Sequence, residues 1–306
     1  MTTLLEKPAS EAPDRQAPPR SFAAWWAVPP LAIVLLAAVY PLVRVCLESL
    51  KVGDNGRGWS TWTGVLSSEA FRDALWRTVA IAVTSTVGCL VLGTFLAIVL
   101  AFVPFPGAQL VGRLIDTVLA LPSFLITLAF TFLYGTAGAV NAALAGLTGD
   151  GSPVLNFLYT PAGVIAAEVT FFTPFVIRPL LASFSMLPRA QLDVAASLGA
   201  SPLRVLRSVV MPEAWPALMA GGSLVLLLTL NEFGIVLFTG AKGVMTLPVL
   251  IYTRGIVTFD LPGAAVIATV QIALSLTLYT LYRVTFARVM TSRGKGDTDV
   301  VVEQAK

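Results

Sequence analysis

Histidine is absent from this sequence of 306 residues, and cysteine occurs only twice. Without histidine, the chain cannot bind zinc through imidazole, use imidazole in acid–base chemistry or form a Ser-His-Asp triad. Cys46 and Cys89 both lie in apolar runs, which favours two buried thiols over a disulfide. We therefore expect no metal ion, no cofactor and no catalytic site in this chain.

Charged residues are also scarce, at 12% of the chain, whereas roughly a quarter of a soluble domain is charged. Hydrophobic residues make up 56%, which predicts a polytopic membrane protein surrounded by membrane lipid. The net charge of +3 is not gathered into a basic stripe with interleaved aromatic residues, so we expect no nucleic-acid partner.

A nucleotide-binding motif is missing as well. No GxxxxGK[ST] sequence occurs, and the segment GAKG at 240–243 is too short and lacks the final Ser or Thr. The chain therefore cannot hydrolyse ATP through such a motif, and any energy from ATP must come from elsewhere.

Six apolar stretches are each long enough to cross a bilayer, which takes roughly 20 helical residues. They predict an all-α fold of six transmembrane helices within residues 22–288. Residues 1–21 lack periodicity and indicate a disordered cytoplasmic tail, and residues 289–306 indicate a second cytoplasmic tail. The expected spans are 23–45, 78–103, 114–134, 162–184, 217–238 and 263–286, and a loop is expected at 135–161.

Six spans place both termini on one side of the membrane. With both termini inside, 13 of the 20 Lys and Arg residues are cytoplasmic and 7 are outside. Cytoplasmic loops carry an excess of basic residues, so this distribution predicts a membrane protein with cytoplasmic N- and C-termini. It also places residues 189–216 in the cytoplasm.

Residues 189–216 are the longest polar interruption in the second half of the chain, and their pattern predicts two short helices joined by a turn. Small and apolar residues of the first helix recur on one face, at Leu192, Ala195, Ala196 and Gly199. Gly199 is expected to end this helix, because glycine tolerates the left-handed conformation that a helix end often needs.

The second helix of this segment is expected at 202–210. The Ser201 hydroxyl would cap it, Pro202 would fit its first position, and Met211-Pro212 would end it, because proline blocks continuation of a helix. Such a helix–turn–helix between two spans fits the surface of another protein, and an ordinary cytoplasmic loop is the alternative.

The sequence DVAASLGASPLRVLRSVVMP at 193–212 resembles the cytoplasmic coupling loop of permease subunits of ATP-binding-cassette importers. That loop has E-A-A, three residues, G and a later L-P. Here D-V-A stands for E-A-A and M-P for L-P, while the glycine and its spacing are kept. The resemblance implies that the residues coupling the permease to its ATPase are Asp193, Ala195, Gly199, Ser201, Pro202 and Pro212.

A second stretch, NEFGIVLFTGAKGVMTLPVLIY at 231–252, is similar to permeases of 2-aminoethylphosphonate uptake systems. Related branches for iron(III), spermidine/putrescine, thiosulfate and molybdate have similar sequences here. The resemblance implies a type I importer of the bacterial inner (plasma) membrane. In such an importer this chain joins a second permease chain (identical or a sister), ATPase subunits and an extracytoplasmic solute-binding protein.

Two acids and one amide fall within the predicted fourth and fifth spans: Glu168, Asn231 and Glu232. Placing a carboxylate in a membrane costs about 2.5–3.5 kcal/mol on insertion scales, so each acid should face a cavity or a partner. We interpret all three residues as lining the translocation path, where an acid could meet a substrate's ammonium group. Polar contacts between helices, or a gate hinge, are the alternative, and Arg178 is a candidate neighbour of Glu168.

Two other classes of protein are weaker interpretations. A proton-coupled secondary transporter would also use Glu168 and Glu232, but it would leave the helix–turn–helix at 189–216 without a purpose. A membrane-embedded enzyme would need a set of catalytic side chains, and the sequence contains none that we recognise.

Overall fold

A computed structural model describes residues 20–52, 56–148 and 153–304, so the predicted tail at 1–21 lies almost wholly outside the described residues. Helices dominate, as predicted, with one small two-stranded sheet. The elements are α1 (Arg20–Ser49), β1 (Lys51–Val52), β2 (Gly56–Arg57), α2 (Ser60–Ser67), α3 (Glu69–Phe102), α4 (Ala108–Leu119), α5 (Ser123–Tyr134), α6 (Ala139–Thr148), α7 (Pro161–Phe172), α8 (Pro174–Ser185), α9 (Arg189–Ser197), α10 (Pro202–Val205), the π-helical turn η1 (Leu206–Val210), α11 (Met211–Leu230), α12 (Gly234–Thr239), α13 (Leu247–Tyr252), the π-helical turn η2 (Thr253–Val257) and α14 (Leu261–Gln304).

Six stretches of the described chain are helical, long and apolar enough to cross a membrane, which confirms the predicted number of spans and the all-α class. They are Trp26–Ser49, Glu69–Phe102, Ser123–Leu147, Pro161–Ser185, Pro202–Leu230 and Leu261–Arg288. The first belongs almost entirely to a unit that ends at Leu47. Within that unit, every side chain from Trp26 to Arg44 is exposed.

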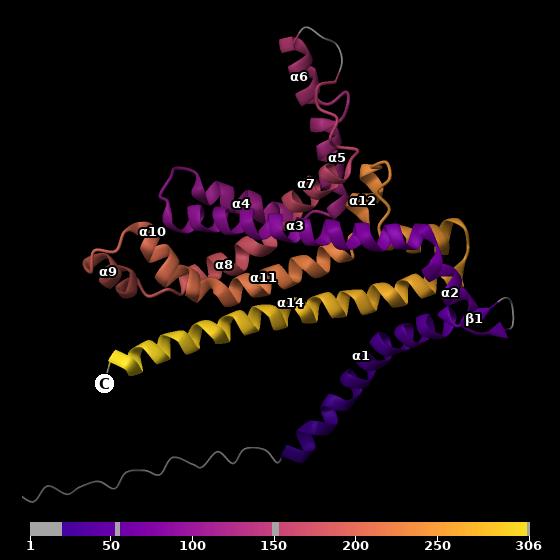
Figure 1. Ribbon diagram of the computed structural model, residues 1–306, viewed down its shortest axis with the longest axis horizontal. Helices are drawn as coiled ribbons and strands as arrows, with labels where there is room; N and C mark the ends of the chain where they lie inside the picture. Colours follow the sequence, from indigo (N-terminus) through magenta and orange to yellow (C-terminus); the bar gives the residue numbers. More distant parts are fainter. Residues whose placement is uncertain (1–19, 53–55, 149–152, 305–306) are drawn as a thin grey trace, which may run out of the picture. The chain divides into compact units, whose positions relative to one another are not determined.

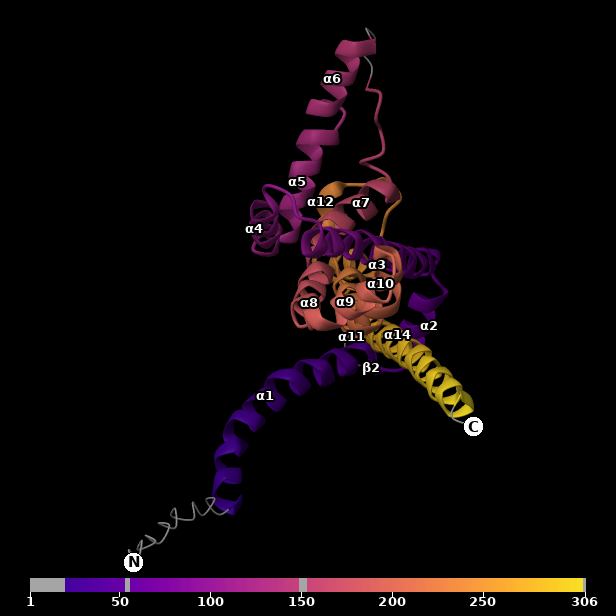
Figure 2. The ribbon, with the colours of Figure 1, turned by 90° about the vertical axis from the view of Figure 1, so that its left-hand side faces the viewer.

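The second unit, Glu48–Lys306, is built around α11, which packs against α3, α8 and α14. These helices run side by side in Figure 1, and Figure 2 shows α5 and α6 leading away from them. Glycines allow the close packing that membrane helices favour. A Cβ at Gly93 of α3 would lie only 2.8 Å from Val176 Cβ, and one at Gly221 of α11 would lie 3.1 Å from the Phe175 carbonyl oxygen.

The predicted third span, 114–134, is wrong in its bounds. Helix α4 ends at Leu119, and the third span runs from Ser123 to Leu147 through α5 and α6. Pro122 explains the break, because proline disfavours a helical conformation in the residue before it. The segment predicted as a loop at 135–161 therefore contributes α6 to this span.

The predicted fifth span, 217–238, is also displaced. Met211-Pro212 does not end the preceding helix, because η1 leads directly into α11, which begins at Met211. Pro212 lies in the first turn of α11, where a missing N–H group is tolerated. The fifth span is Pro202–Leu230, and the chain breaks after it, before α12.

The fourth and sixth spans agree better with the sequence. The fourth is broken as expected, with α7 ending at Phe172 and α8 starting at Pro174. The sixth lies in α14, which extends beyond the span to Gln304.

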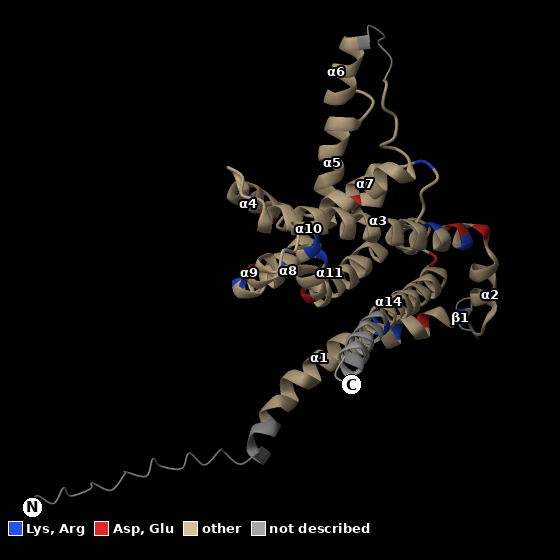
Figure 3. Cartoon of the chain, turned by 60° about the vertical axis from the view of Figure 1, so that its left-hand side comes forward, with Lys and Arg blue, Asp and Glu red and all other residues tan. Residues whose placement is uncertain are grey.

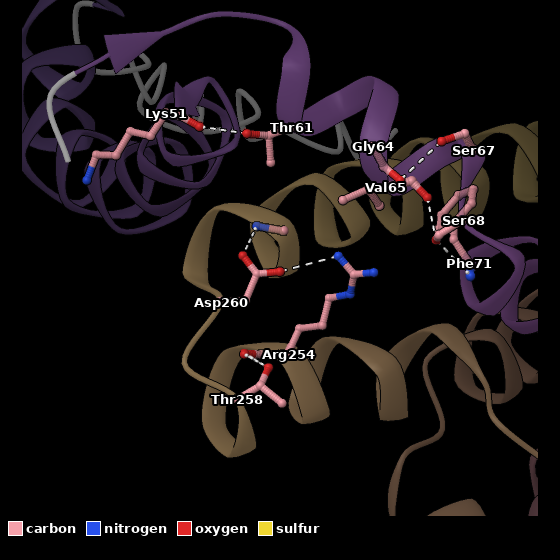
Figure 4. Close-up of polar contacts among 11 residues, drawn as sticks. Lys51, Thr61, Gly64, Val65, Ser67, Ser68, Phe71, Arg254, Thr258 and Asp260 are labelled. Atoms are coloured by element: carbon pink, nitrogen blue, oxygen red, sulfur yellow. Dashed lines mark hydrogen bonds and ion pairs between the residues drawn. The ribbon is translucent and has the colours of Figure 1, made fainter. Parts of the chain in front are cut away.

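The end of the second unit remote from α9 and α10 holds α2 and the turn into α14 (Figure 1). In this turn Asp260 accepts a hydrogen bond from the Gly263 N–H at 2.9 Å and pairs with Arg254 at 3.3 Å (Figure 4). Thr61 Oγ1 donates to the Lys51 carbonyl at 2.9 Å and so joins α2 to β1. These contacts fix the loops at this end of the bundle.

Candidate functional site

The turn between α9 and α10 has the predicted geometry. Gly199 has φ 78°, in the left-handed region. The N–H groups of Gly199 and Ala200 donate to the carbonyls of Ala196 at 2.9 Å and Ala195 at 3.1 Å. These bonds satisfy carbonyls at the end of α9, so Gly199 ends the helix as its sequence position predicts.

The start of the second helix differs in one detail from the prediction. Pro202 occupies its first turn as expected, but the Ser201 side chain makes no capping hydrogen bond. The Ser201 backbone carbonyl instead accepts from the Val205 N–H at 3.0 Å. The expectation of a hydroxyl cap is therefore wrong, and the fixed φ of proline is what favours the helix start here.

An apolar groove of about 580 Å³ lies between this segment and the end of α3. Asp193 and Pro202 are the two predicted coupling residues that line it. The remaining lining residues are Ile98, Phe102, Val103, Leu192, Ala196, Ala200, Leu203, Val205, Leu206 and Val210. Of the other predicted coupling residues, Ala195 is half-buried and Gly199 and Ser201 are exposed, while Pro212 lies apart at the start of α11.

The outer surface of the segment carries apolar side chains that the sequence pattern did not single out. Leu198 is 83% exposed, and Val194 and Leu203 are exposed as well. The basic residues of this segment are Arg189 of α9, Arg204 of α10 and Arg207 of η1 (Figure 3). The sequence pattern does not single out the exposed apolar side chains, because the predicted helical face consists of residues such as Leu192, which packs inward.

Glu232 lies in the break between α11 and α12, with 8% of its surface exposed. Its Oε1 atom accepts hydrogen bonds from Ser123 Oγ at 3.0 Å and from the Ile235 N–H at 2.8 Å. Gly234 leaves room for this contact, because a Cβ there would lie 3.3 Å from Glu232 Oε1. The carboxylate therefore joins the beginning of α5 to the beginning of α12.

Asn231, the preceding residue, contacts a different helix. Its side-chain amide donates to the Leu227 carbonyl at 2.8 Å and lies 3.5 Å from Ser275 Oγ of α14. Gln271 of α14 donates to the Leu230 carbonyl at 2.6 Å. Asn231 thus belongs to the α11–α14 contact, whereas Glu232 belongs to the α5–α12 contact.

Glu168 of α7 is completely buried, and neither of its carboxylate oxygens has a hydrogen-bond partner. Arg178 does not pair with it. Instead, Arg178 of α8 forms an ion pair with Asp116 and donates to the Gly112 carbonyl at 2.9 Å, both on α4. Glu168 is therefore buried within the helix bundle, and the predicted neighbour Arg178 does not pair with it.

Residues 89–291 match the family of binding-protein-dependent transport system inner membrane components. The chain belongs to this family. It is a permease of the ATP-binding-cassette importer class.

Named relatives and solved structures agree with this assignment. The protein PhnU of Salmonella paratyphi A, which is named a putative 2-aminoethylphosphonate transport system permease protein, is 49% identical over 86% of this chain and 91% of its own length. The sulfate transport system permease CysT of Escherichia coli is 28% identical over 81% and 86%. A bacterial ABC transporter involved in alginate import shares the fold of this permease, with a TM-score of 0.76 at 16% identity, over 88% of this chain and 96% of that chain.

Proposed function

We propose that this permease carries 2-aminoethylphosphonate, or a closely similar aminophosphonate, across the inner membrane. The observation that carries the proposal is its 49% identity to PhnU along 86% of the chain. Relatives named for sulfate transport are 28–33% identical over 61–81% of this chain. A substrate related to that of PhnU is therefore favoured over iron(III), polyamines, thiosulfate and molybdate.

ATP hydrolysis in this proposal occurs in separate ATPase subunits, which dock on α9 and α10. The exposed Leu198, Val194 and Leu203 supply an apolar surface of the kind that anchors a protein partner. Gly199 and Pro202 fix the shape of that surface. The apolar side chains that line the groove behind it, on this segment and on α3, would carry a movement of the segment to α3. Nucleotide-driven closure of the ATPases would then tilt the spans.

The complex would also contain a second permease chain and an extracytoplasmic solute-binding protein. The exposed apolar side chains of α1 are consistent with a helix surrounded by lipid and a second permease. The alginate transporter of similar fold forms a complex with a periplasmic protein that holds its substrate. The distribution of Lys and Arg favours cytoplasmic N- and C-termini around a permease domain at 22–288.

The path of the substrate would run near Glu168, Asn231 and Glu232. Glu168 lies in the fourth span, whereas Asn231 and Glu232 directly follow the fifth span rather than lying within it, and both acids are buried. Acids within a membrane protein usually face an internal path or a partner, which supports this placement.

Reconstitution tests the proposal. The full-length permease is purified from detergent with the partners that remain bound, which mass spectrometry identifies, and the complex is placed in proteoliposomes. ATP-dependent uptake of 2-aminoethylphosphonate is expected, and the recovered binding protein should bind this compound more tightly than sulfate, iron(III) or spermidine. A permease that transports it without any ATPase would instead be a secondary transporter.

A further inference from the structure

Glu168 combines complete burial with the lack of any partner in the described part of the chain. Neither oxygen accepts a hydrogen bond, and the ion pairs found there involve other acids. The residue lies about 10 Å along α7 from its start, at 1.5 Å per residue, inside the span Pro161–Ser185. Burying a carboxylate without a partner is energetically costly, so we infer that Glu168 has a partner in another state of the protein.

The surroundings of Glu168 include a second polar group in the same condition. Ser85 of α3 faces the Glu168 carboxylate, is fully buried, and its hydroxyl has no hydrogen-bond partner. The Ser85 hydroxyl lies within reach of the Glu168 carboxylate, but the present geometry of the two groups is not that of a hydrogen bond. Native proteins pair nearly all of their buried polar groups. A hydrogen bond from Ser85 would still leave one Glu168 oxygen without a partner, which indicates a place for a ligand.

The charge nearby specifies what kind of ligand fits. Glu232 is close enough for its charge to act on Glu168, but its own oxygen is occupied by Ser123 and Ile235. Arg178 is occupied by Asp116. The described residues around Glu168 therefore add negative charge and no free cation, which favours a positively charged ligand from outside the chain.

We propose that the Glu168 carboxylate and the Ser85 hydroxyl bind the ammonium group of the substrate during its passage. The inference rests on the proposed function, because an aminophosphonate carries an ammonium group at one end and a phosphonate at the other. An ammonium group has only donors, and a carboxylate and a hydroxyl oxygen are acceptors for it. Glu232 holds α5 and α12 together and is not the ammonium site.

For the substrate to reach Glu168, α7 must move away from α3. Gly88 of α3 meets Val169 of α7 with no side chain of its own, so no α3 side chain interlocks with α7 at this point. A joint lies five residues after Glu168, where Thr173 separates α7 from α8 and Pro174 lacks a backbone N–H. A tilt of α7 about this joint opens the polar pair without unfolding either helix.

The test uses the complete transporter in proteoliposomes, with uptake of labelled 2-aminoethylphosphonate and ATP hydrolysis stimulated by the loaded binding protein as two readouts. Glu168→Gln keeps the size of the side chain and removes its charge, and Glu168→Asp keeps the charge. Glu69→Gln, at an exposed acid in the first turn of α3, is the matched control. Assembly of each variant is measured by co-purification.

We expect Glu168→Gln to lower uptake at least ten-fold while stimulated ATP hydrolysis stays within two-fold of the wild type, and Glu168→Asp to retain more uptake. Uptake by Glu168→Gln near the wild-type level overturns the inference. Loss of uptake and of stimulated hydrolysis together also overturns it, because that pattern shows a packing role. Absence of uptake by the wild-type complex shows that the proposed substrate is wrong, which separates this failure from that of Glu168 alone.

Discussion

The Ser123 hydroxyl donates a hydrogen bond of 3.0 Å to the Glu232 carboxylate, and this contact joins residues 109 positions apart in the sequence. It connects the start of α5 to the break after α11. The same carboxylate oxygen also accepts a hydrogen bond from the Ile235 N–H group. A carboxylate that looked like a candidate for the translocation path is therefore also a joint between helices.

Replacing this carboxylate should weaken the joint in a graded way. Glu232→Ala leaves the Ser123 hydroxyl and the Ile235 N–H without their acceptor, which costs about 1–3 kcal/mol for a buried donor, whereas Glu232→Gln keeps an oxygen and should cost less. Thermal unfolding in detergent measures the order. Uptake by Glu232→Gln, in an assembled complex, shows whether the charge also serves transport, and unchanged uptake would leave Glu232 with the structural role alone.

The left-handed Gly199 gives a prediction about coupling. No atom lies within 4 Å of a Cβ built there, so the cost of a side chain comes from the backbone. Gly199→Val should strain the turn by about 1–2 kcal/mol, whereas Gly199→Asn is tolerated better in this conformation. We expect the Val variant to reduce stimulated ATP hydrolysis several-fold and the Asn variant to stay near the wild type. Equal activity of the two variants would contradict this role of the turn.

Exposed Leu198 should contribute to ATPase binding. Leu198→Asp places a charge where we propose an apolar contact, and loss of an interface anchor typically costs more than about 1 kcal/mol. Recovery of the ATPase in a pull-down should fall at least five-fold, by the conversion of that energy at 25 °C. Val154→Asp, at another exposed apolar residue in the segment before α7, is the control. Equal recovery with both variants would place the docking surface elsewhere.

Gly222 and Tyr282 give a prediction about packing between α11 and α14. A Cβ at Gly222 would overlap the Tyr282 hydroxyl, which is buried and has no hydrogen-bond partner. Gly222→Ala should destabilise the protein by roughly 1–3 kcal/mol, as overpacking does. Tyr282→Phe should be neutral or stabilising, and should partly rescue Gly222→Ala. Melting temperatures of the four proteins in one detergent check this, and additive effects would refute the proposed overlap.

The sequence at 189–216 was sufficient to predict that two short helices meet at a turn at Gly199. These features depend on residues a few positions apart, namely a glycine where a left-handed conformation is needed and a proline at a helix start. The path of the chain after the second helix was not predictable in the same way. A proline can end a helix, or it can lie in the first turn of one. Pro212 lies in the first turn of α11, which follows η1 without a break.

The sequence by itself determined that the chain is an all-α membrane protein with six spans, because the length and apolarity of a segment decide whether it can lie in a bilayer. Only the tertiary structure decided which polar groups meet. Asn231 and Glu232 are adjacent in sequence yet contact α14 and α5, and Arg178 pairs with Asp116 rather than with Glu168. Such pairings depend on which helices become neighbours, which is set by packing between segments far apart in the chain and leaves little trace in local sequence.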